Sequence, residues 1–206
     1  MKLLFSLASP FVRKVRVVAL EAGYTIGERG DLVPEPTKVH PVERNESIRD
    51  SNPLAQVPTL ILDDGTALHD SRVIVEYLDA EKGAELFPAP GPARWRALVD
   101  QSLADGVLDA GLLARYEDGV RPEAQRHEGW KAGQMAKIRD GLDAMERRAA
   151  DYGDRVDIGT IATGCTLGWL DFRFGTMNWR EGRPALAAWF DRISERPSFR
   201  DTVPVG

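Results

Sequence analysis

The sequence contains very little cysteine. Cys165 is the one cysteine among 206 residues, and no CxxC pair is present. A single cysteine cannot form a disulfide within the chain, and dithiol or zinc chemistry needs at least two neighbouring cysteines. The sequence therefore excludes a disulfide-stabilised scaffold and predicts no metal site.

Long apolar runs and excess positive charge are also missing. The apolar start at residues 3–5 is too short for a signal peptide, and no stretch approaches the ~20 apolar residues of a membrane span. The 27 Lys and Arg residues are outnumbered by 32 Asp and Glu residues, which gives a net charge of −5. Nucleic-acid-binding proteins usually concentrate positive charge. We expect a cytoplasmic protein without nucleic-acid or membrane partners.

The first part of the chain has clear strand and helix signals. Residues 3–7 are typical of a short buried strand, and apolar spacing predicts a helix over residues 10–22. Ser9 is placed as its N-cap and Pro10 as its first residue, while Gly23 follows its end. These three residues fix both ends of the predicted helix.

A second group of signals completes the first domain. Residues 24–32 are the candidate for a second strand, and residues 34–52 predict a loop with at most one short helix. Residues 57–62 and 67–69 predict antiparallel strands around an Asp-Gly turn, and a helix begins at Asp70-Ser71. The order of these elements is that of a thioredoxin-like domain.

The second half of the chain predicts only helices, at about residues 93–117, 122–150, 157–172 and 184–195. Residues 87–92 contain three prolines, which cannot continue a helix. We therefore predict an α/β thioredoxin-like domain over residues 1–80, a linker over 81–92 and an all-α helical bundle over 93–206.

Three short segments of the first domain carry candidate chemistry. Pro58 opens an apolar strand, where it removes a backbone donor. A cis Val57-Pro58 bond would leave the Val57 backbone free to pair with a ligand, and the alternative is a trans proline on an edge strand. Ser9 lies where a helix N-terminus favours an anion such as a thiolate, although it could be a plain N-cap. Asp70 and Ser71 could cap a helix or hold an amino-acid head group.

Together, these segments resemble those of the glutathione S-transferase family. The matching residues are Ser9–Arg16, Asn52–Leu60 and Leu68–Ser71 with Ile74–Leu78, and in the helical half Ala104–Ala110, Trp130–Met145 and Pro184–Phe190. The resemblance spans nearly the whole chain. Residues 157–162 are similar to the family's N-capping box, but Thr160 replaces the usual acid, so we expect a weaker cap with Asp157 as the capping residue.

The resemblance implies a role for each matching residue. Ser9 would donate a hydrogen bond to the glutathione sulfur, and Val57, ahead of Pro58, would pair through its backbone with the cysteinyl unit. Asp70 and Ser71 would hold the γ-glutamyl group, and Phe11 would flank the site. Gln56 occupies the place of a frequent lysine that reaches the glycyl carboxylate. The sequence leaves open whether Lys38, Arg44 or Arg49 compensates.

The remaining implications concern the second substrate and assembly. The resemblance predicts a homodimer and an electrophile pocket on the helical domain. Its candidate residues are Asp105, Leu108, Leu112, Tyr116 and Trp169, any of which could instead be core. The resemblance implies a glutathione transferase that adds glutathione to small hydrophobic electrophiles. The alternatives are a non-catalytic interaction or regulatory module and a glutathione-dependent isomerase or dehalogenase. Serine at position 9, where many relatives have cysteine, favours conjugation over disulfide reduction.

Overall fold

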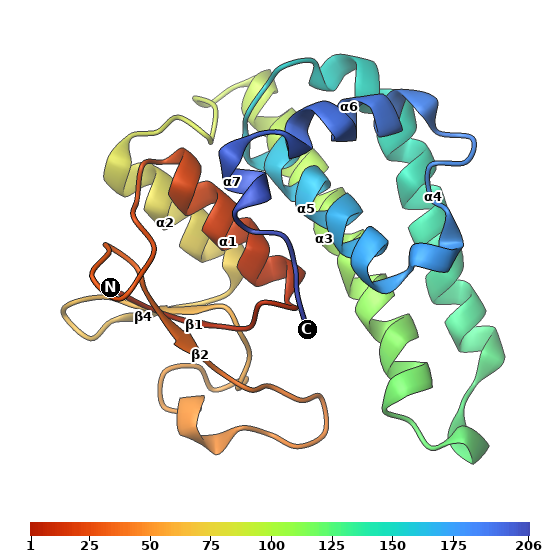
Figure 1. Ribbon diagram of the computed structural model, residues 1–206, viewed down its shortest axis with the longest axis horizontal. Coiled ribbons are helices and arrows are strands. Elements are labelled where there is room, and N and C mark those ends of the chain that lie inside the picture. Colours follow the sequence, from red (N-terminus) through yellow and green to blue (C-terminus); the bar gives the residue numbers. More distant parts are fainter. The chain divides into compact units, whose positions relative to one another are not determined.

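The computed structural model describes residues 1–206, which form two compact units. The first contains Met1–Arg94 and Pro197–Gly206, and the second contains Trp95–Arg196. The first unit is a thioredoxin-like α/β domain and the second consists of helices (Figure 1). The predicted fold class is therefore confirmed.

The first unit is built on one mixed sheet. Its strands are β1 (Lys2–Phe5), β2 (Val33–Pro36), β3 (Thr59–Ile61) and β4 (Ala67–Leu68). The strand order is β2-β1-β3-β4, with β1 parallel to β2 and antiparallel to β3, and β3 antiparallel to β4. Buried apolar side chains of β1 and β3 face the core, among them Leu3 and Leu60.

Two helices cover one face of this sheet (Figure 1): α1 (Pro10–Glu21) and α2 (Ser71–Lys82). The short helix α7 (Pro197–Arg200) returns to α1 at the end of the chain. There Arg13 NH2 donates to the Phe199 carbonyl at 3.2 Å, and Ser198 Oγ donates to Glu21. This return explains why residues 197–206 belong to the first unit.

The predicted position of the second strand was wrong. Residues 24–32 form only an isolated bridge between Ile26 and Leu32, and β2 lies at Val33–Pro36, inside the predicted loop. Pro34 and Pro36 argued against a strand, since each lacks a backbone donor. β2 is at the edge of the sheet, however, where the unpaired side needs no donor. The short helix expected in this loop is η1 (Glu46–Ile48).

The second unit contains four long helices. These are α3 (Pro92–Gly119, from Trp95 on within this unit), α4 (Glu128–Tyr152), α5 (Ile158–Arg173) and α6 (Pro184–Ser194), with short turns η2 (Glu123–Gln125) and η3 (Gly175–Met177). The four predicted helices are confirmed with shifted ends. The contacts group residues 81–94 with the first unit, whereas the sequence assigned 81–92 to a linker.

Helix α5 is buried along almost its whole length. Asp157 caps it by accepting from the Thr160 N–H at 3.0 Å, and the Asp157 N–H donates to Thr160 Oγ1 at 2.9 Å. Both hydrogen bonds of a capping box are therefore present, and the Thr160 hydroxyl takes the place of the usual carboxylate. Cys165, on this helix, is completely buried.

Glycines allow α5 to approach α3 closely. A Cβ atom on Gly159 would lie 2.7 Å from the Ala97 carbonyl oxygen, and one on Gly111 would lie 2.6 Å from the Trp169 ring. Thr166 Oγ1 also donates to the Ala104 carbonyl at 3.3 Å. Residue numbers rise together along both helices at these contacts, so α3 and α5 run parallel.

We expect Gly111→Ala to destabilise the protein by about 1–2 kcal/mol, because the new methyl group meets the buried Trp169 ring. Gly106→Ala is the matched control on the same helix, where a Cβ atom meets nothing within 4 Å. That change should be stabilising by about 0.5–1 kcal/mol, since glycine weakens a helix interior. Urea unfolding measures both. Equal effects of the two substitutions would contradict the close α3–α5 packing.

Candidate functional site

Three predicted segments meet at one end of the sheet. Leu4 of β1 pairs with Thr59 of β3, so the end of β1 lies beside the start of β3. Leu68 of β4 pairs with Leu60, which brings the end of β4 to the same end of the sheet. Ser9 follows β1, the Val57-Pro58 bond precedes β3, and Asp70-Ser71 follow β4. The pairing of the strands therefore brings these three segments of the first unit close together.

Ser9 is the N-cap of α1. Its hydroxyl oxygen accepts a hydrogen bond from the Val12 N–H at 3.3 Å, and Pro10 occupies the first helical position. The hydroxyl hydrogen donates to no group within the chain. A half-buried donor at the positive end of a helix suits an anion such as a thiolate. The serine is thus both a cap and an available donor.

The Val57-Pro58 peptide is cis, as the sequence predicted. The Val57 N–H and carbonyl have no hydrogen-bond partner within the chain. The loop around them is held by Asn52, whose amide nitrogen donates to the Gln56 carbonyl and to Thr59 Oγ1, both at 3.0 Å. The segment therefore presents one unpaired donor and one unpaired acceptor from a fixed loop.

Asp70 and Ser71 begin α2. The Asp70 carboxylate accepts from the Arg72 N–H at 2.9 Å and forms an ion pair with the Arg72 guanidinium at 2.8 Å. The hydrogen bond from the Arg72 side chain is the main reason that the pKa of Asp70 lies below its usual value. Ser71 is 3% exposed, and its hydroxyl has no partner within the chain. A charged acceptor and a buried free hydroxyl thus lie side by side.

Lys14 was not among the predicted site residues. It is 1% exposed, and its Nζ lies 5.7 Å from the centre of the Phe11 ring. Its positive charge contributes to lowering the pKa of Asp70, which places the first turns of α1 within electrostatic range of the start of α2. A lysine in an apolar helical run was the available signal, since buried lysines are rare.

Three basic residues were candidates for the glycyl carboxylate. Arg44 and Arg49 both pair with Glu46, at 3.6 and 3.0 Å. The Lys38 ammonium group has no partner within the chain. Lys38 follows β2, whose Pro36 pairs with Phe5 at the end of β1. Of the three candidates, Lys38 is therefore the one whose ammonium group has no partner and that lies near the end of β1.

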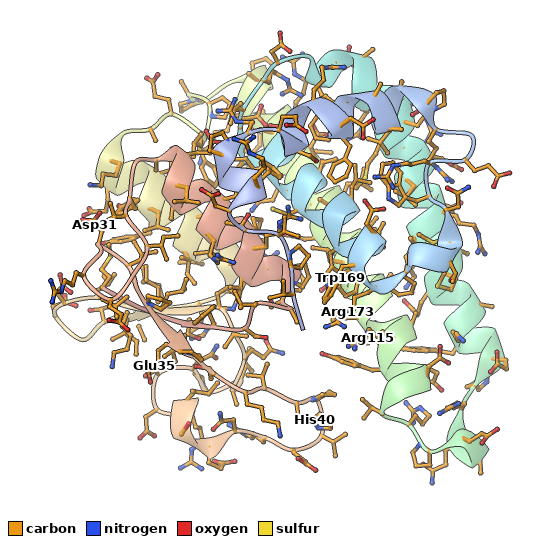
Figure 2. The ribbon with its side chains drawn as sticks, in the orientation of Figure 1. Asp31, Glu35, His40, Arg115, Trp169 and Arg173 are labelled. Carbon is orange, nitrogen blue, oxygen red and sulfur yellow. The ribbon has the colours of Figure 1, made fainter.

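The predicted electrophile residues of the second unit differ in burial. Leu108 and Trp169 are each 1% exposed and Asp105 is 8% exposed, so these three belong largely to the interior. Leu112 and Tyr116 are half-buried. Figure 2 shows Trp169 between the lower parts of α3 and α5. Of the five, Leu112 and Tyr116 offer the most side-chain surface to a ligand.

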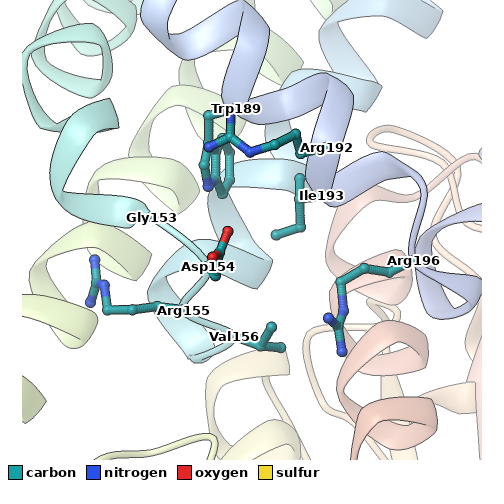
Figure 3. Close-up of a pocket in the computed structure, with 8 residues that line it drawn as sticks. All are labelled: Gly153, Asp154, Arg155, Val156, Trp189, Arg192, Ile193 and Arg196. Carbon is teal, nitrogen blue, oxygen red and sulfur yellow. The ribbon is translucent and has the colours of Figure 1, made fainter.

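The second unit also has a hollow that the sequence analysis did not predict (Figure 3). It is lined by Asp154, Trp189, Arg192 and Arg196, among others. Arg192 NH1 donates to the Ala188 carbonyl at 3.2 Å. None of the predicted site residues lies here.

Two of the three histidines have structural partners. His40 Nδ1 accepts from the Glu43 N–H at 3.1 Å, and His127 Nδ1 caps α4 by accepting from the Trp130 N–H at 3.0 Å. The chain holds no cluster of three or more His, Cys, Asp or Glu residues suited to a metal ion. None of its helices combines the length and hydrophobicity needed to cross a membrane.

Known proteins match both units. Residues 3–86 match the family model for the glutathione S-transferase N-terminal domain, and residues 128–192 match the model for the C-terminal domain. An uncharacterised GST-like protein of Escherichia coli (strain K12) is 34% identical, over 99% of this chain and 98% of its own.

A glutathione transferase family member from Pseudomonas fluorescens Pf-5, solved with bound glutathione, is 40% identical with a TM-score of 0.94, over 100% of this chain and 99% of its own. The same relative was also solved with S-(propanoic acid)-glutathione. A glutathione S-transferase of Methylobacillus flagellatus, with glutathione bound, is 37% identical with a TM-score of 0.88 over 99% of both chains. The chain belongs to the glutathione S-transferase family.

Proposed function

We propose that this protein is a glutathione transferase that activates the glutathione thiol for reaction with small electrophiles. One observation carries the proposal: the Ser9 hydroxyl, with an unused hydrogen at the start of α1, lies at the same end of the sheet as the unpaired Val57 backbone. The bound glutathione of the Pseudomonas and Methylobacillus relatives supports this assignment.

The chain offers a group for each part of the tripeptide. The Val57 N–H and carbonyl pair with the cysteinyl backbone, as in an added strand. The Asp70 carboxylate receives the γ-glutamyl ammonium, while the Ser71 hydroxyl and the free N–H groups of α2 receive its carboxylate. Phe11 flanks the sulfur, the Gln56 side chain reaches the glycyl end, and Lys38 supplies charge there.

The mechanism requires no deprotonated residue of the protein. Ser9 donates a hydrogen bond to the sulfur and the α1 N-terminus adds positive potential, so the pKa of the bound thiol falls and its proton goes to water. With an aryl chloride, the sulfur forms a bond to the ring carbon, the carbon–chlorine bond breaks, and chloride leaves. A serine cannot form a mixed disulfide with glutathione, so this site favours conjugation.

Calorimetry with glutathione, followed by assays with an aryl halide, an isothiocyanate and a peroxide, tests the proposal. We expect heat of binding and turnover of at least one electrophile. Binding without any turnover would indicate a non-catalytic module instead. Turnover of an isomerisation or dehalogenation substrate alone would assign the same thiolate to that chemistry. Absence of both binding and turnover would overturn the proposal.

Lys38 provides a separate prediction about the glycyl end. Lys38→Gln should weaken glutathione binding about threefold, the effect of losing one exposed charge interaction. Arg49→Gln is the matched control, because Arg49 is paired with Glu46 and its loss changes net charge equally. Calorimetric titration at low salt measures both variants. A larger loss in the Arg49 variant would show that Lys38 is the wrong residue.

A further inference from the structure

The hollow shown in Figure 3 is formed by two segments of the second unit. One is the loop between α4 and α5, with Asp154, Arg155 and Val156, and the other is the last part of α6, with Trp189 and Arg192. All of the lining residues belong to the second unit. The volume of the hollow is about 230 Å³, below the roughly 300–1,000 Å³ typical of ligand pockets. The hollow is therefore of a size for a small molecule.

The loop side of the hollow is held in place by ion pairs. Arg155 Nη1 binds the Asp157 carboxylate at 2.7 Å, and Arg155 Nη2 lies 3.7 Å from the Asp100 carboxylate. The Nε group of Arg155 also donates to the Asp151 carbonyl at 3.1 Å. These contacts neutralise the charge of Arg155 within the chain and fix the loop that carries Asp154. A wall that is ordered in advance lowers the entropy cost of binding a ligand.

Trp189 contributes a buried donor without a partner. The residue is 2% exposed, and its ring packs on Tyr152 with the ring centres 4.8 Å apart. Buried tryptophans usually pair their indole N–H, but that of Trp189 has no hydrogen-bond acceptor within the chain. Its indole nitrogen is not sealed in the interior, in contrast to the unpaired amide nitrogen of Gln101. A ligand in the hollow would supply the acceptor that this donor lacks.

Two charged groups of opposite sign also line the hollow, Arg192 and Asp154. Arg192 forms no ion pair, and its hydrogen bond within the chain is the one from Nη1 to the Ala188 carbonyl at 3.2 Å. The Asp154 carboxylate has neither a hydrogen-bond nor an ion-pair partner within the chain. Arg196, which lines the hollow as well, has an interaction of its own within the chain. The charges available to a ligand are therefore one cation and one anion.

These groups match the chemistry of a zwitterion. The guanidinium group of Arg192 and the indole N–H of Trp189 are donors that suit a carboxylate, whereas the Asp154 carboxylate only accepts and suits an ammonium group. A ligand with a carboxylate alone would be repelled by Asp154, and a ligand with an ammonium group alone would be repelled by Arg192. Val156 and Ile193 add apolar surface to the same hollow.

We propose that the hollow binds a free α-amino acid with an apolar side chain. The carboxylate of this ligand accepts from Arg192 and from the Trp189 N–H, and its ammonium group donates to Asp154. Its side chain lies against Val156 and Ile193. The residues proposed for glutathione all belong to the first unit, so this is a second binding site with a different ligand.

Three forms of leucine test the two charges one at a time. Leucine carries both, its methyl ester keeps only the ammonium group, and N-acetyl-leucine keeps only the carboxylate. The probe is the indole N–H signal of Trp189 in the NMR spectrum of isotope-labelled protein, assigned as the signal that Trp189→Phe lacks. We expect leucine to shift this signal until it saturates. Each derivative should bind about tenfold more weakly, because it loses one charge-assisted contact.

Variants of the two charged residues give the second part of the test. Arg192→Gln and Asp154→Asn should each weaken leucine binding about fivefold, the effect of losing one exposed charge interaction. Two exposed residues of α4 provide controls with the same changes in net charge: Arg147→Gln and Asp140→Asn should leave leucine binding unaltered. All four variants should keep the wild-type affinity for glutathione.

The outcomes separate this site from the one proposed for glutathione. No shift of the Trp189 signal at millimolar leucine would overturn the amino-acid site, whether or not glutathione binds. Equal binding of leucine and N-acetyl-leucine would show that Asp154 does not select an ammonium group, and would also overturn it. Unchanged leucine binding by both Arg192→Gln and Asp154→Asn would have the same consequence.

Discussion

Ser9→Ala is expected to lower kcat/KM for conjugation about 100-fold, while the affinity for glutathione changes little. A loss of this size is expected because the substitution removes one pre-aligned hydrogen-bond donor to the negatively charged sulfur. The affinity should persist because the Val57 backbone and the Asp70-Ser71 pair hold the rest of the tripeptide. Steady-state kinetics and calorimetry on the same preparation measure the two effects separately.

The cap function of Ser9 needs its own control. Alanine also removes the bond from the Val12 N–H, which should cost about 1 kcal/mol of stability. Ser9→Thr restores both the cap and the donor and should recover most of the activity. Ser6→Ala changes a serine of the same turn and should have little effect on activity or stability. Retention of wild-type activity by Ser9→Ala, with the protein folded, would rule out Ser9 as the activating residue.

The second large effect is expected from Asp70→Asn, which should weaken glutathione binding about 30-fold. A hydrogen bond between charged groups contributes roughly 1.5–3 kcal/mol, and asparagine cannot attract the ammonium. Asparagine is as good an N-cap as aspartate, so α2 should keep its start. Calorimetric titration with glutathione gives the affinity, and thermal unfolding checks the fold.

The pH dependence and a matched variant sharpen this test. Because Arg72 and Lys14 hold the pKa of Asp70 below its usual value, the carboxylate stays charged near neutral pH and is protonated only in strong acid. Its contribution to binding should therefore be constant near neutrality and disappear only as the pH falls through the lowered pKa. Asp64→Asn, an exposed turn residue that accepts from the Thr66 N–H, changes the net charge equally and should not alter affinity.

Local sequence signals predicted the parts of the fold that local chemistry determines. Ser9, Pro10 and Gly23 marked the limits of α1, and the Asp-Gly turn marked the β3–β4 hairpin. The second strand was misplaced because its two prolines are tolerated only at the edge of a sheet. That edge position depends on the strand order and could not be read from residues 33–36 alone.

Long-range packing produced the features that the sequence could not reveal. The return of α7 to α1 depends on contacts such as the one between Arg13 and the Phe199 carbonyl. The close approach of α3 and α5 depends on the contact between Gly111 and the Trp169 ring. Neither feature has a local pattern, because the partners are separated by many residues.

The pKa of the glutathione thiol, measured by the ultraviolet absorbance of the thiolate, tests the central claim most directly. A free thiol titrates at about 8.5. We predict that the wild-type protein lowers the pKa of the bound thiol by at least one unit, and that Ser9→Ala returns it close to the free value. An unchanged pKa on binding to the wild-type protein would contradict the claim that Ser9 and the start of α1 stabilise a thiolate.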